Sequence, residues 1–438
     1  MKNNKIPRFT AIRSSSSGCC LYFVAHAGPV YENSTNLGMT HFCEHLIIGK
    51  LQQMHGSLLQ QLTAFGGKFT AQTHKDKMIL MFTCLPQFIH RLWTALNDAF
   101  HWSLSDIDNG TLSLETAIIS NETNLIKHSN LDNARNIVDS FLSMTISLLS
   151  DQRYNRSPLG DVQRNPLFKN PKAVHMAMNQ LVQSLHLVCS VPNKHVDFCK
   201  KSFFKLVRSN NSKRNQRAYN VDLYAKLKPN IPRIVCEQGS RNIVLLGFKC
   251  FPHGHVLKPF LDLAIYALFN SPWSLALRRL RFEKGLVYSI NVKYTPFHHT
   301  GALVIGFQCD QTKNQAVALE IFSNILTGFC KNGLKDDVTF DFGMYIDGFI
   351  SSVKMSCAES ICKETAFVAT NILHQSVYGI SLNRYIKVFK SMDYTRDKCI
   401  DALSQVIKAC NIMYAQSMDK DNLARLKHTL KNIMYIGS

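Results

Sequence analysis

The chain has 438 residues, a length typical of two to four domains and too long for one ordinary core. Hydrophobic residues make up 46% of the sequence and charged residues 18%, which is typical of globular proteins and excludes a disordered chain. The net charge is +20, from 50 Lys and Arg against 30 Asp and Glu. This charge suits an acidic partner, a nucleic acid or an anionic membrane surface. Because no RNA-binding signature, zinc knuckle or arginine-rich arm is present, we expect no specific nucleic-acid partner.

Location is indicated by the cysteines and the N-terminus. No run of 18 or more uncharged apolar residues occurs, so we expect no membrane span. The 14 cysteines form no C-x-x-C pair and no evenly spaced framework, and no apolar signal segment precedes them. This pattern predicts reduced thiols in an intracellular, cytoplasmic protein. A basic, serine-containing N-terminus and a lysine- and asparagine-rich composition leave two alternatives, the mitochondrial matrix and a viral particle or infected-cell cytoplasm.

The first 65 residues are expected to contain two strands and two helices. Residues 8–13 and 19–25 are β-prone, and the polar turn between them predicts a hairpin. A helix is predicted over 37–48, ended by Gly49, and a second helix over 57–64.

The first of these helices carries the motif H-x-x-E-H. His41 and His45 are four residues apart, so they lie on one face of a helix, and Glu44 projects from the same face. Two neutral imidazoles can hold a metal, and the carboxylate beside them can take a proton from water. The motif therefore predicts a hydrolytic zinc site. Cys43 points to another side of the helix and is expected to be a small buried residue.

The elements after the motif continue an α+β pattern. Strands are predicted over 68–73 and 77–84, and a helix over 87–100. A long helical region over 112–149 carries Glu115 and Glu122, which are seven residues apart and therefore share a face. Taken alone, these two acids indicate only a solvated helix surface.

The second half repeats the order of elements in the first. A polar, basic stretch without apolar periodicity begins at residue 208 and is the predicted linker. The predicted elements beyond it are a strand over 242–250, helices over 258–268 and 273–282, a hairpin over 286–309 and long helices over 314–373. The repeat predicts duplication of an α+β unit. The predicted domains are 1–207, the linker 208–232, and 233–438.

Three groups of residues carry a resemblance to a known family. Gly28, Glu32, Asn36 and Gly38 precede the motif, Phe65–Thr73 is similar to a G-G-x-x-N-A-x-T strand, and Leu280–Ser289 is similar to an L-R-x-x-x-G-L-x-Y segment. In this order they resemble the pitrilysin, insulysin and mitochondrial processing peptidase family, the inverzincin zinc metallopeptidases. The resemblance implies two α/β-roll halves, each a ferredoxin-like sheet with helices.

The resemblance also implies roles for individual residues. Glu122, 77 residues beyond His45, stands at the spacing of the family's third zinc ligand, and Glu115 stands where the family has a carboxylate that orients the site. Glu44 is then the general base, and Arg281 and Tyr288 are implied to stabilise the oxyanion.

A substrate site and a partner are implied as well. The strand bearing Gly67, Phe69, Thr70 and Ala71 is implied to bind the substrate backbone by strand addition. Thr70 departs from the family's asparagine, which puts cleavage rate and substrate preference in doubt. Since short members of the family form dimers, we expect a homodimer or a heterodimer with a related subunit.

The sequence therefore predicts a Zn²⁺-dependent metalloendopeptidase that hydrolyses unfolded peptides or targeting segments. The main alternative is a non-catalytic core or assembly subunit of the same fold. Binding of nucleic acid through the basic charge is a third, weaker alternative.

Overall fold

The computed structural model describes residues 8–13, 18–129, 134–149, 151–160, 162–208, 224–237, 242–376 and 381–416. The chain forms two compact units, and each gathers segments from both halves of the sequence. The first consists of Met1–Leu131, Arg153–Tyr219 and Met355–Gln375. The second consists of Asp132–Gln152, Asn220–Lys354 and Ser376–Ser438.

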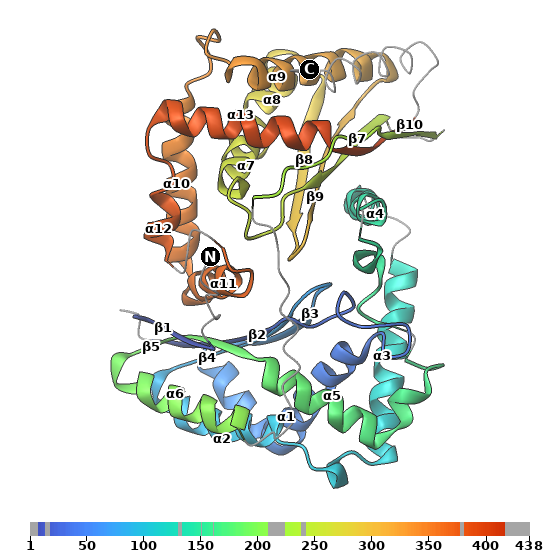
Figure 1. The fold of residues 1–438 in the computed structure, drawn as a ribbon, viewed down its shortest axis with the longest axis vertical. Coiled ribbons are helices and arrows are strands. Elements are labelled where there is room, and N and C mark those ends of the chain that lie inside the picture. Colours follow the sequence, from blue (N-terminus) through green and yellow to red (C-terminus); the bar gives the residue numbers. More distant parts are fainter. Residues whose placement is uncertain are drawn as a thin grey trace. The chain divides into compact units, whose positions relative to one another are not determined.

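The first unit is built on a sheet that has five strands in the described residues, in the order β1-β5-β2-β4-β3. Its strands are β1 (Phe9–Arg13), β2 (Cys19–Ala25), β3 (Phe69–Thr73), β4 (Met78–Cys84) and β5 (His186–Val191). Helices cover one face, as Figure 1 shows: α1 (Met39–Ala64), α2 (Ile89–Phe100), α5 (Pro171–Ser184) and α6 (Asn193–Arg208), with α3 (Asn109–Ser129) beside α1. The apolar residues between this face and the helices form the main core.

The predicted hairpin of the first two strands is wrong. β1 pairs in parallel with β5, and β2 lies between β5 and β4, antiparallel to both. Every residue of β2 is buried, so this strand needs neighbours on both edges and cover on both faces. The short β1 is consequently placed at the sheet edge.

The two predicted helices 37–48 and 57–64 are one helix. α1 runs through Gly49 to Ala64, and its backbone leaves helical geometry at His55, with φ −131° and ψ 25°. Gly49 therefore does not end a helix; it lies within α1, close to Glu115 of α3. The hairpin β3–β4 and helix α2 agree with the prediction, whereas α6 was not predicted.

The second face of this sheet is covered by α11 (Ile361–Leu373), from far along the chain. Val368, Ala369, Ile372 and Leu373 pack against a patch of buried residues on the strands, namely Tyr22, Val24, Ile79 and Val188. Near the end of the helix, His26 Nε2 lies 2.8 Å from the carbonyl oxygen of Leu373. The sheet thus has helices on both faces.

The second unit repeats this plan. Its sheet, also five-stranded in the described residues, has the order β6-β10-β7-β9-β8. The strands are β6 (Arg233–Glu237), β7 (Asn242–Cys250), β8 (Val287–Pro296), β9 (Gly301–Cys309) and β10 (Cys410–Gln416). The first strand pairs in parallel with the last, as β1 pairs with β5. The predicted α+β fold of two similar halves is confirmed, although β6 and β10 were not predicted.

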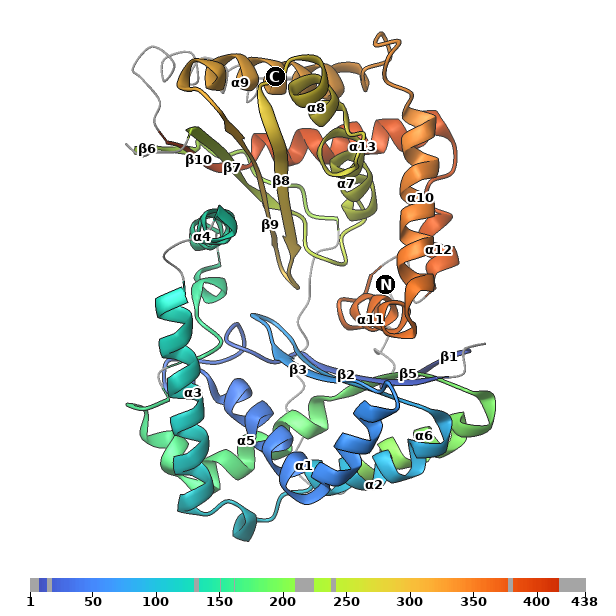
Figure 2. The ribbon, with the colours of Figure 1, turned by 180° about the vertical axis from the view of Figure 1, so that it is seen from behind.

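Helices of the second unit are visible from behind in Figure 2. They are α7 (Lys258–Ile265), α8 (Leu275–Leu277), α9 (Thr312–Asn332), α10 (Phe342–Glu359), α12 (Leu382–Ile386) and α13 (Met392–Lys408), with π-helical turns η5 (Tyr266–Asn270) and η6 (Arg278–Glu283). A helix from earlier in the chain, α4 (Ala134–Ser147), packs on β7 and β9. There the rings of Phe141 and Tyr414 lie 6.0 Å apart.

The compact units differ from a contiguous division of the chain. α4 belongs to the second unit and α11 to the first, although the predicted domains 1–207 and 233–438 would assign them the other way. Most of the predicted linker, 209–223, lies outside the described residues.

One stretch of the described residues, Lys258–Glu283, is long and apolar enough to cross a membrane by length and composition alone. Of its apolar window, 67% is buried inside the structure. A buried core helix can have the same length and apolar composition, and the burial of this stretch is typical of such a helix.

Candidate metal centre

The motif histidines lie next to each other on α1. The ring centroids of His41 and His45 are 4.6 Å apart and their planes meet at 78°. His41 is buried, whereas the His45 side chain is 21% exposed. The four-residue spacing therefore produces the predicted pairing on one helix face.

Residues before the helix hold its first turn in place. The Glu32 carboxylate accepts hydrogen bonds from the backbone N–H groups of Gly38 and Thr40, each at 2.7 Å. Gly38 has φ +95°, and a Cβ there would lie 2.8 Å from the carbonyl oxygen of Leu159. Only glycine fits this position without strain. These contacts explain why Glu32 and Gly38 precede the motif.

Helix α3 supplies two carboxylates to the histidines. Glu122 Oε2 lies 3.6 Å from His41 Nε2 and 3.5 Å from His45 Nε2. Potential ligand atoms of His41, His45 and Glu122 all lie within 4.8 Å of one another, the one such cluster of three found in the described residues. Glu115, two turns earlier on α3, lies 3.4 Å from His45 Nδ1. The structure thus brings together the predicted ligands and the predicted orienting acid.

The donors and their spacing fit a zinc ion. Zinc takes His nitrogen and carboxylate oxygen at about 2.0–2.1 Å, which in a tetrahedron puts neighbouring ligand atoms about 3.3–3.4 Å apart. The distances from Glu122 Oε2 to the Nε2 atoms of His41 and His45, 3.6 and 3.5 Å, are close to that value. Nδ1 of His41 is buried and has no hydrogen-bond partner among the described residues.

Electrostatics differ at the two histidines. Burial, with the neighbouring His45, lowers the pKa of His41 to about 4, so its ring is neutral, as a metal ligand must be. Burial also disfavours the charged form of His45. The carboxylates of Glu115, Glu44 and Glu122 outweigh this effect and raise its pKa. With a proton on Nδ1 facing Glu115, His45 would offer Nε2 to an ion.

Glu44 lies beside the ligands and is 7% exposed. Burial raises the pKa of its carboxyl group, partly opposed by a hydrogen bond from Thr73 Oγ1 to Glu44 Oε2. Thr73 belongs to β3, so this bond ties the candidate base to the candidate substrate strand. This contact was not predicted from the sequence. Its signal was the alternation of β3, which places Thr73 on the same side as Phe69 and Ala71.

Gly49 gives Glu115 room to approach α1. A Cβ at Gly49 would lie 2.8 Å from Glu115 Oε1. The glycine interpreted from the sequence as a helix end is therefore the point where α3 approaches the motif helix. This functional role was also missed, because it depends on a residue 66 positions away in the sequence.

The predicted substrate strand lies at a sheet edge. β3 pairs only with β4 in the described sheet. Thr83 N–H donates to the Lys68 carbonyl and His74 N–H donates to the Lys77 carbonyl, so the even-numbered residues face β4. The backbone groups of Phe69 and Ala71 therefore point to the open edge, whereas those of Thr70 are used within the sheet. Gly67, just before the strand, donates its N–H to Leu62.

Arg281 and Tyr288 lie in the second unit. Arg281 is on η6 and Tyr288 on β8, and the guanidinium carbon of Arg281 lies 4.5 Å from the centre of the Tyr288 ring. Tyr288 is 75% exposed, so its hydroxyl is free of the core. The structure thus brings this pair together.

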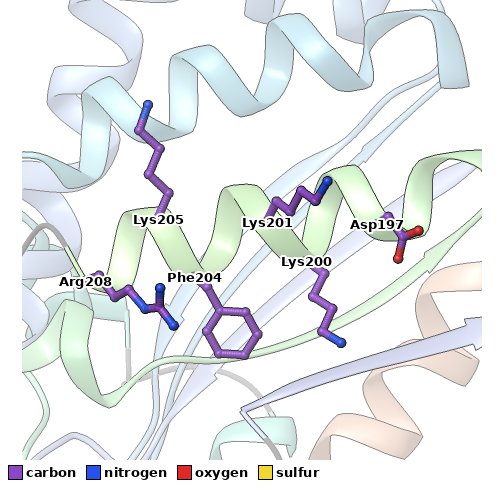
Figure 3. Close-up of a pocket in the computed structure, with 6 residues that line it drawn as sticks. All are labelled: Asp197, Lys200, Lys201, Phe204, Lys205 and Arg208. Atoms are coloured by element: carbon purple, nitrogen blue, oxygen red, sulfur yellow. The ribbon is translucent and has the colours of Figure 1, made fainter.

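A basic hollow of about 710 Å³ lies along α6. Figure 3 shows its residues projecting from different sides of the helix: Asp197, Lys200, Lys201, Phe204, Lys205 and Arg208. None of them belongs to the metal centre. The arrangement is an open helix surface that accounts for part of the basic charge.

The fold resembles those of several solved peptidase structures. A peptidase M16 inactive domain from Pseudomonas fluorescens aligns with a TM-score of 0.69 at 12% identity, over 94% of this chain and 95% of that one. A protease from Helicobacter pylori aligns with a TM-score of 0.69 at 14% identity, over 94% of this chain and 98% of that one. The first half of the periplasmic protease PqqL from Escherichia coli aligns with a TM-score of 0.67 at 12% identity, over 99% of this chain and 96% of that one. At these identities the likeness concerns the fold alone.

Sequence comparison is more specific. No curated protein matches the chain. Residues 189–338 match the peptidase M16 inactive domain, and residues 10–144, which hold all residues of the metal cluster, match the insulinase domain of peptidase family M16. The two matches together span well over half of the sequence. The chain therefore belongs to the insulinase family of peptidases, family M16, as its resemblance to pitrilysin and the processing peptidases predicted.

Proposed function

We propose that the protein is a zinc-dependent metalloendopeptidase acting on unfolded peptides or targeting segments. The observation that carries the proposal is the convergence of His41, His45 and Glu122, with Glu44 buried beside them. These three ligands would hold Zn²⁺. When bound, zinc supplies a Lewis acid that lowers the pKa of water toward about 7 and polarises a carbonyl.

The chain's own residues have separate tasks in this proposal. Glu44 takes the proton of the attacking water and later gives it to the leaving amine. Thr73 orients the Glu44 carboxylate through its hydroxyl. Glu115 fixes the ring of His45. Phe69 and Ala71 present open backbone groups that can pair with an extended substrate, and Gly67 and Thr70 shape the start of that strand.

Arg281 and Tyr288 are proposed to donate to the tetrahedral oxyanion. Their mutual stacking supports this role, because the exposed ring and guanidinium already hold a common position. The proposed assembly is a dimer, either of two copies or with a related subunit. We also propose an intracellular location, since the 14 cysteines form no C-x-x-C pair and no evenly spaced framework in the sequence.

The deciding experiment compares wild type with Glu44→Gln. We expect about one zinc per chain in both proteins, measured by elemental analysis, because Glu44 is not a ligand. An unstructured peptide library should be cleaved by wild type alone, and a zinc chelator should abolish that cleavage. Equal background cleavage by both proteins would reject catalysis.

That negative result would favour the second candidate, a non-catalytic core or assembly subunit. The match of residues 189–338 to a domain described as inactive supports this candidate. Against it, a decayed site would have no need to keep Glu44 beside the three potential ligands.

A further inference from the structure

Three aromatic side chains are exposed together at one place on the second unit. Trp273, between η5 and α8, is 66% exposed, Phe282 on η6 is 52% exposed, and Tyr288 on β8 is 75% exposed. The centroids of the Trp273 and Phe282 rings are 5.4 Å apart, and their planes meet at 35°. Large aromatic rings carry much apolar surface, and a contiguous exposed patch of such surface commonly marks a binding site.

Arg281 joins the three rings into one row. Its guanidinium carbon lies 5.4 Å from the centre of the Phe282 ring and 4.5 Å from that of Tyr288. Attraction between a guanidinium and ring faces holds the arginine between the two rings. The four side chains thus contact one another in the order Trp273, Phe282, Arg281, Tyr288, and we refer to them as the aromatic row.

Backbone contacts hold both ends of the aromatic row. The Trp273 carbonyl accepts a hydrogen bond from Tyr345 Oη at 2.6 Å. At the other end, Gly285 N–H donates to the Arg281 carbonyl at 3.0 Å, and Gly285 has φ +62°, so the chain turns directly from η6 into β8. η6 is itself a π-helical turn, a geometry that is frequent at functional sites. The backbone that carries the row is therefore fixed before any ligand binds.

The charges of η6 leave Arg281 available. Arg278 Nε lies 3.6 Å from Glu283 Oε1, and Arg279 is paired with Asp337. In the described part of the chain, Arg281 forms no ion pair of this kind. Its guanidinium can therefore donate to a peptide oxygen, while the two exposed rings at the other end of the row offer apolar faces. A further aromatic side chain can stack on such faces or meet them edge-to-face.

We infer that Trp273 and Phe282 form a subsite for an aromatic side chain of the peptide substrate, an inference that rests on the proposed peptidase function. A peptide held at an oxygen by Arg281 and Tyr288 would place a nearby side chain on the two rings, because all four groups form one continuous row. Ring–ring contact and the removal of apolar surface from water favour phenylalanine, tyrosine or tryptophan over a small residue. The substrate class is therefore unfolded peptides with an aromatic residue close to the scissile bond.

Tryptophan fluorescence reports on the subsite directly. The sequence has three tryptophans, of which Trp93 and Trp102 are buried and Trp273 is exposed. Acrylamide should therefore quench Trp273 far more than the other two. Trp273→Ala should remove most of the quenchable emission, which confirms the assignment of the signal.

The binding test uses full-length, zinc-loaded Glu44→Gln protein, which the proposed function predicts to bind peptides without cleaving them. The probe is a flexible peptide of about ten Gly, Ser and Asn residues with one central Phe. At saturation it should reduce the acrylamide quenching constant about threefold, because its ring covers Trp273. The same peptide with Ala in place of Phe should leave the quenching constant unchanged at equal concentration.

Selectivity of cleavage gives a second measurement. In the wild-type protein, kcat/KM should be about tenfold higher for the Phe peptide than for the Ala peptide. Trp273→Ala should bring this ratio close to one, and Trp273→Phe, which keeps a ring, should restore most of it. Tyr224→Ala, at an exposed tyrosine outside the row, is the matched control and should keep the wild-type ratio.

The outcomes separate this inference from the proposed function. If no protein cleaves either peptide but the Phe peptide shields Trp273 in Glu44→Gln, catalysis is rejected and the subsite stands. If wild type cleaves both peptides and Trp273→Ala keeps the wild-type ratio, the subsite is rejected and catalysis stands. Equal shielding by the Ala peptide would overturn the inference. So would shielding that rises with protein concentration in the absence of peptide, because a second copy of the chain would then cover the row.

Discussion

His45 is contacted on both ring nitrogens, by Glu115 at Nδ1 and by Glu122 at Nε2. His41 has only its Nε2 near a carboxylate among the described residues, and its Nδ1 is buried without a hydrogen-bond partner there. Glu115 therefore holds the side of the His45 ring that faces away from Glu122. A residue that orients a ligand in this way contributes to metal affinity without touching the metal.

Replacing Glu115 by glutamine tests that role. The amide removes the charge that holds the Nδ1 proton of His45, so zinc affinity should fall by about 10–100-fold. The dissociation constant can be measured by competition with a chromophoric chelator. Glu320→Gln, an exposed glutamate on α9, is the matched control and should bind zinc as wild type does. Zinc affinity within twofold of wild type for Glu115→Gln would exclude an orienting role.

Gly49 and Gly56 offer a matched pair on the same helix. A Cβ at Gly49 meets the Glu115 carboxylate, whereas nothing lies within 4 Å of one at Gly56. Gly56→Ala should raise the free energy of unfolding by about 0.5–1 kcal/mol, because alanine loses less backbone entropy in a helix. Gly49→Ala should weaken zinc binding by about tenfold, since Glu115 must move.

Denaturant unfolding and chelator competition measure the two effects separately. For Gly56→Ala, zinc affinity should not change. A gain in stability for Gly49→Ala with unchanged zinc affinity would mean that Glu115 adapts freely, and the proposed reason for a glycine at this position would be wrong.

At the level of residues, regular spacing made the cluster of His41, His45 and Glu122 predictable. The separations of His41 from His45 and of Glu115 from Glu122 place each pair on one helix face, and the family resemblance brought the two helices together. The contacts of Thr73 with Glu44 and of Gly49 with Glu115 join different elements. The alternation of β3 indicates which face Thr73 lies on, but no local pattern encodes how closely two elements pack, so neither contact was predicted from the sequence.

At the level of elements, β3 combines a structural role with the substrate-binding role that we propose for it. Its even-numbered residues bond to β4, and its odd-numbered residues leave N–H and C=O groups at the open edge. A substrate added as a further strand would use those of Phe69 and Ala71. Within the described residues β3 has no strand partner on its outer edge, and this edge lies beside the candidate metal cluster, which is consistent with peptide binding.

Proline substitutions can distinguish the two edges of β3. Ala71→Pro removes an outward N–H, which should lower kcat/KM on a peptide by about tenfold, the equivalent of one lost hydrogen bond. Thr70→Pro removes an N–H paired with β4 and should lower the melting temperature instead. Zinc content of Ala71→Pro should equal that of wild type. Undiminished peptide cleavage by Ala71→Pro would argue against strand addition at this edge.

Long periodic elements and the β3–β4 hairpin were predicted well, whereas the pairings between strands far apart in the sequence were not. The β3–β4 hairpin and the helix following it show their turn residues and periodicity directly. β1 pairs with β5 across more than 170 residues, and β10 pairs with β6 at a similar separation. Short strands at a sheet edge carry weak patterns of their own, so their partners emerge only from the fold.

At the level of the whole molecule, the two halves of the sequence exchange helices. α4 covers the second sheet and α11 covers the first. The exchange is reciprocal, which fits the duplication predicted from the repeated order of elements. Chain order does not specify which sheet a helix covers. The contiguous division predicted at residues 207 and 233 therefore does not contain this exchange of helices.

The proposed dimer predicts complementation between two inactive variants. In Glu44→Gln the base is lost, and in Arg281→Ala an oxyanion donor is lost, so each homodimer should be inactive. If Arg281 of one subunit serves the metal centre of the other, a mixed dimer has one site with both defects and one site with none. Equal amounts, unfolded and refolded together, give half mixed dimers and should recover about 25% of wild-type cleavage. If each subunit is self-sufficient, both of its sites are defective in the mixture and no activity returns. Light scattering on the same samples establishes that dimers formed, so a dimer without recovered activity would reject shared sites while leaving the zinc centre itself intact.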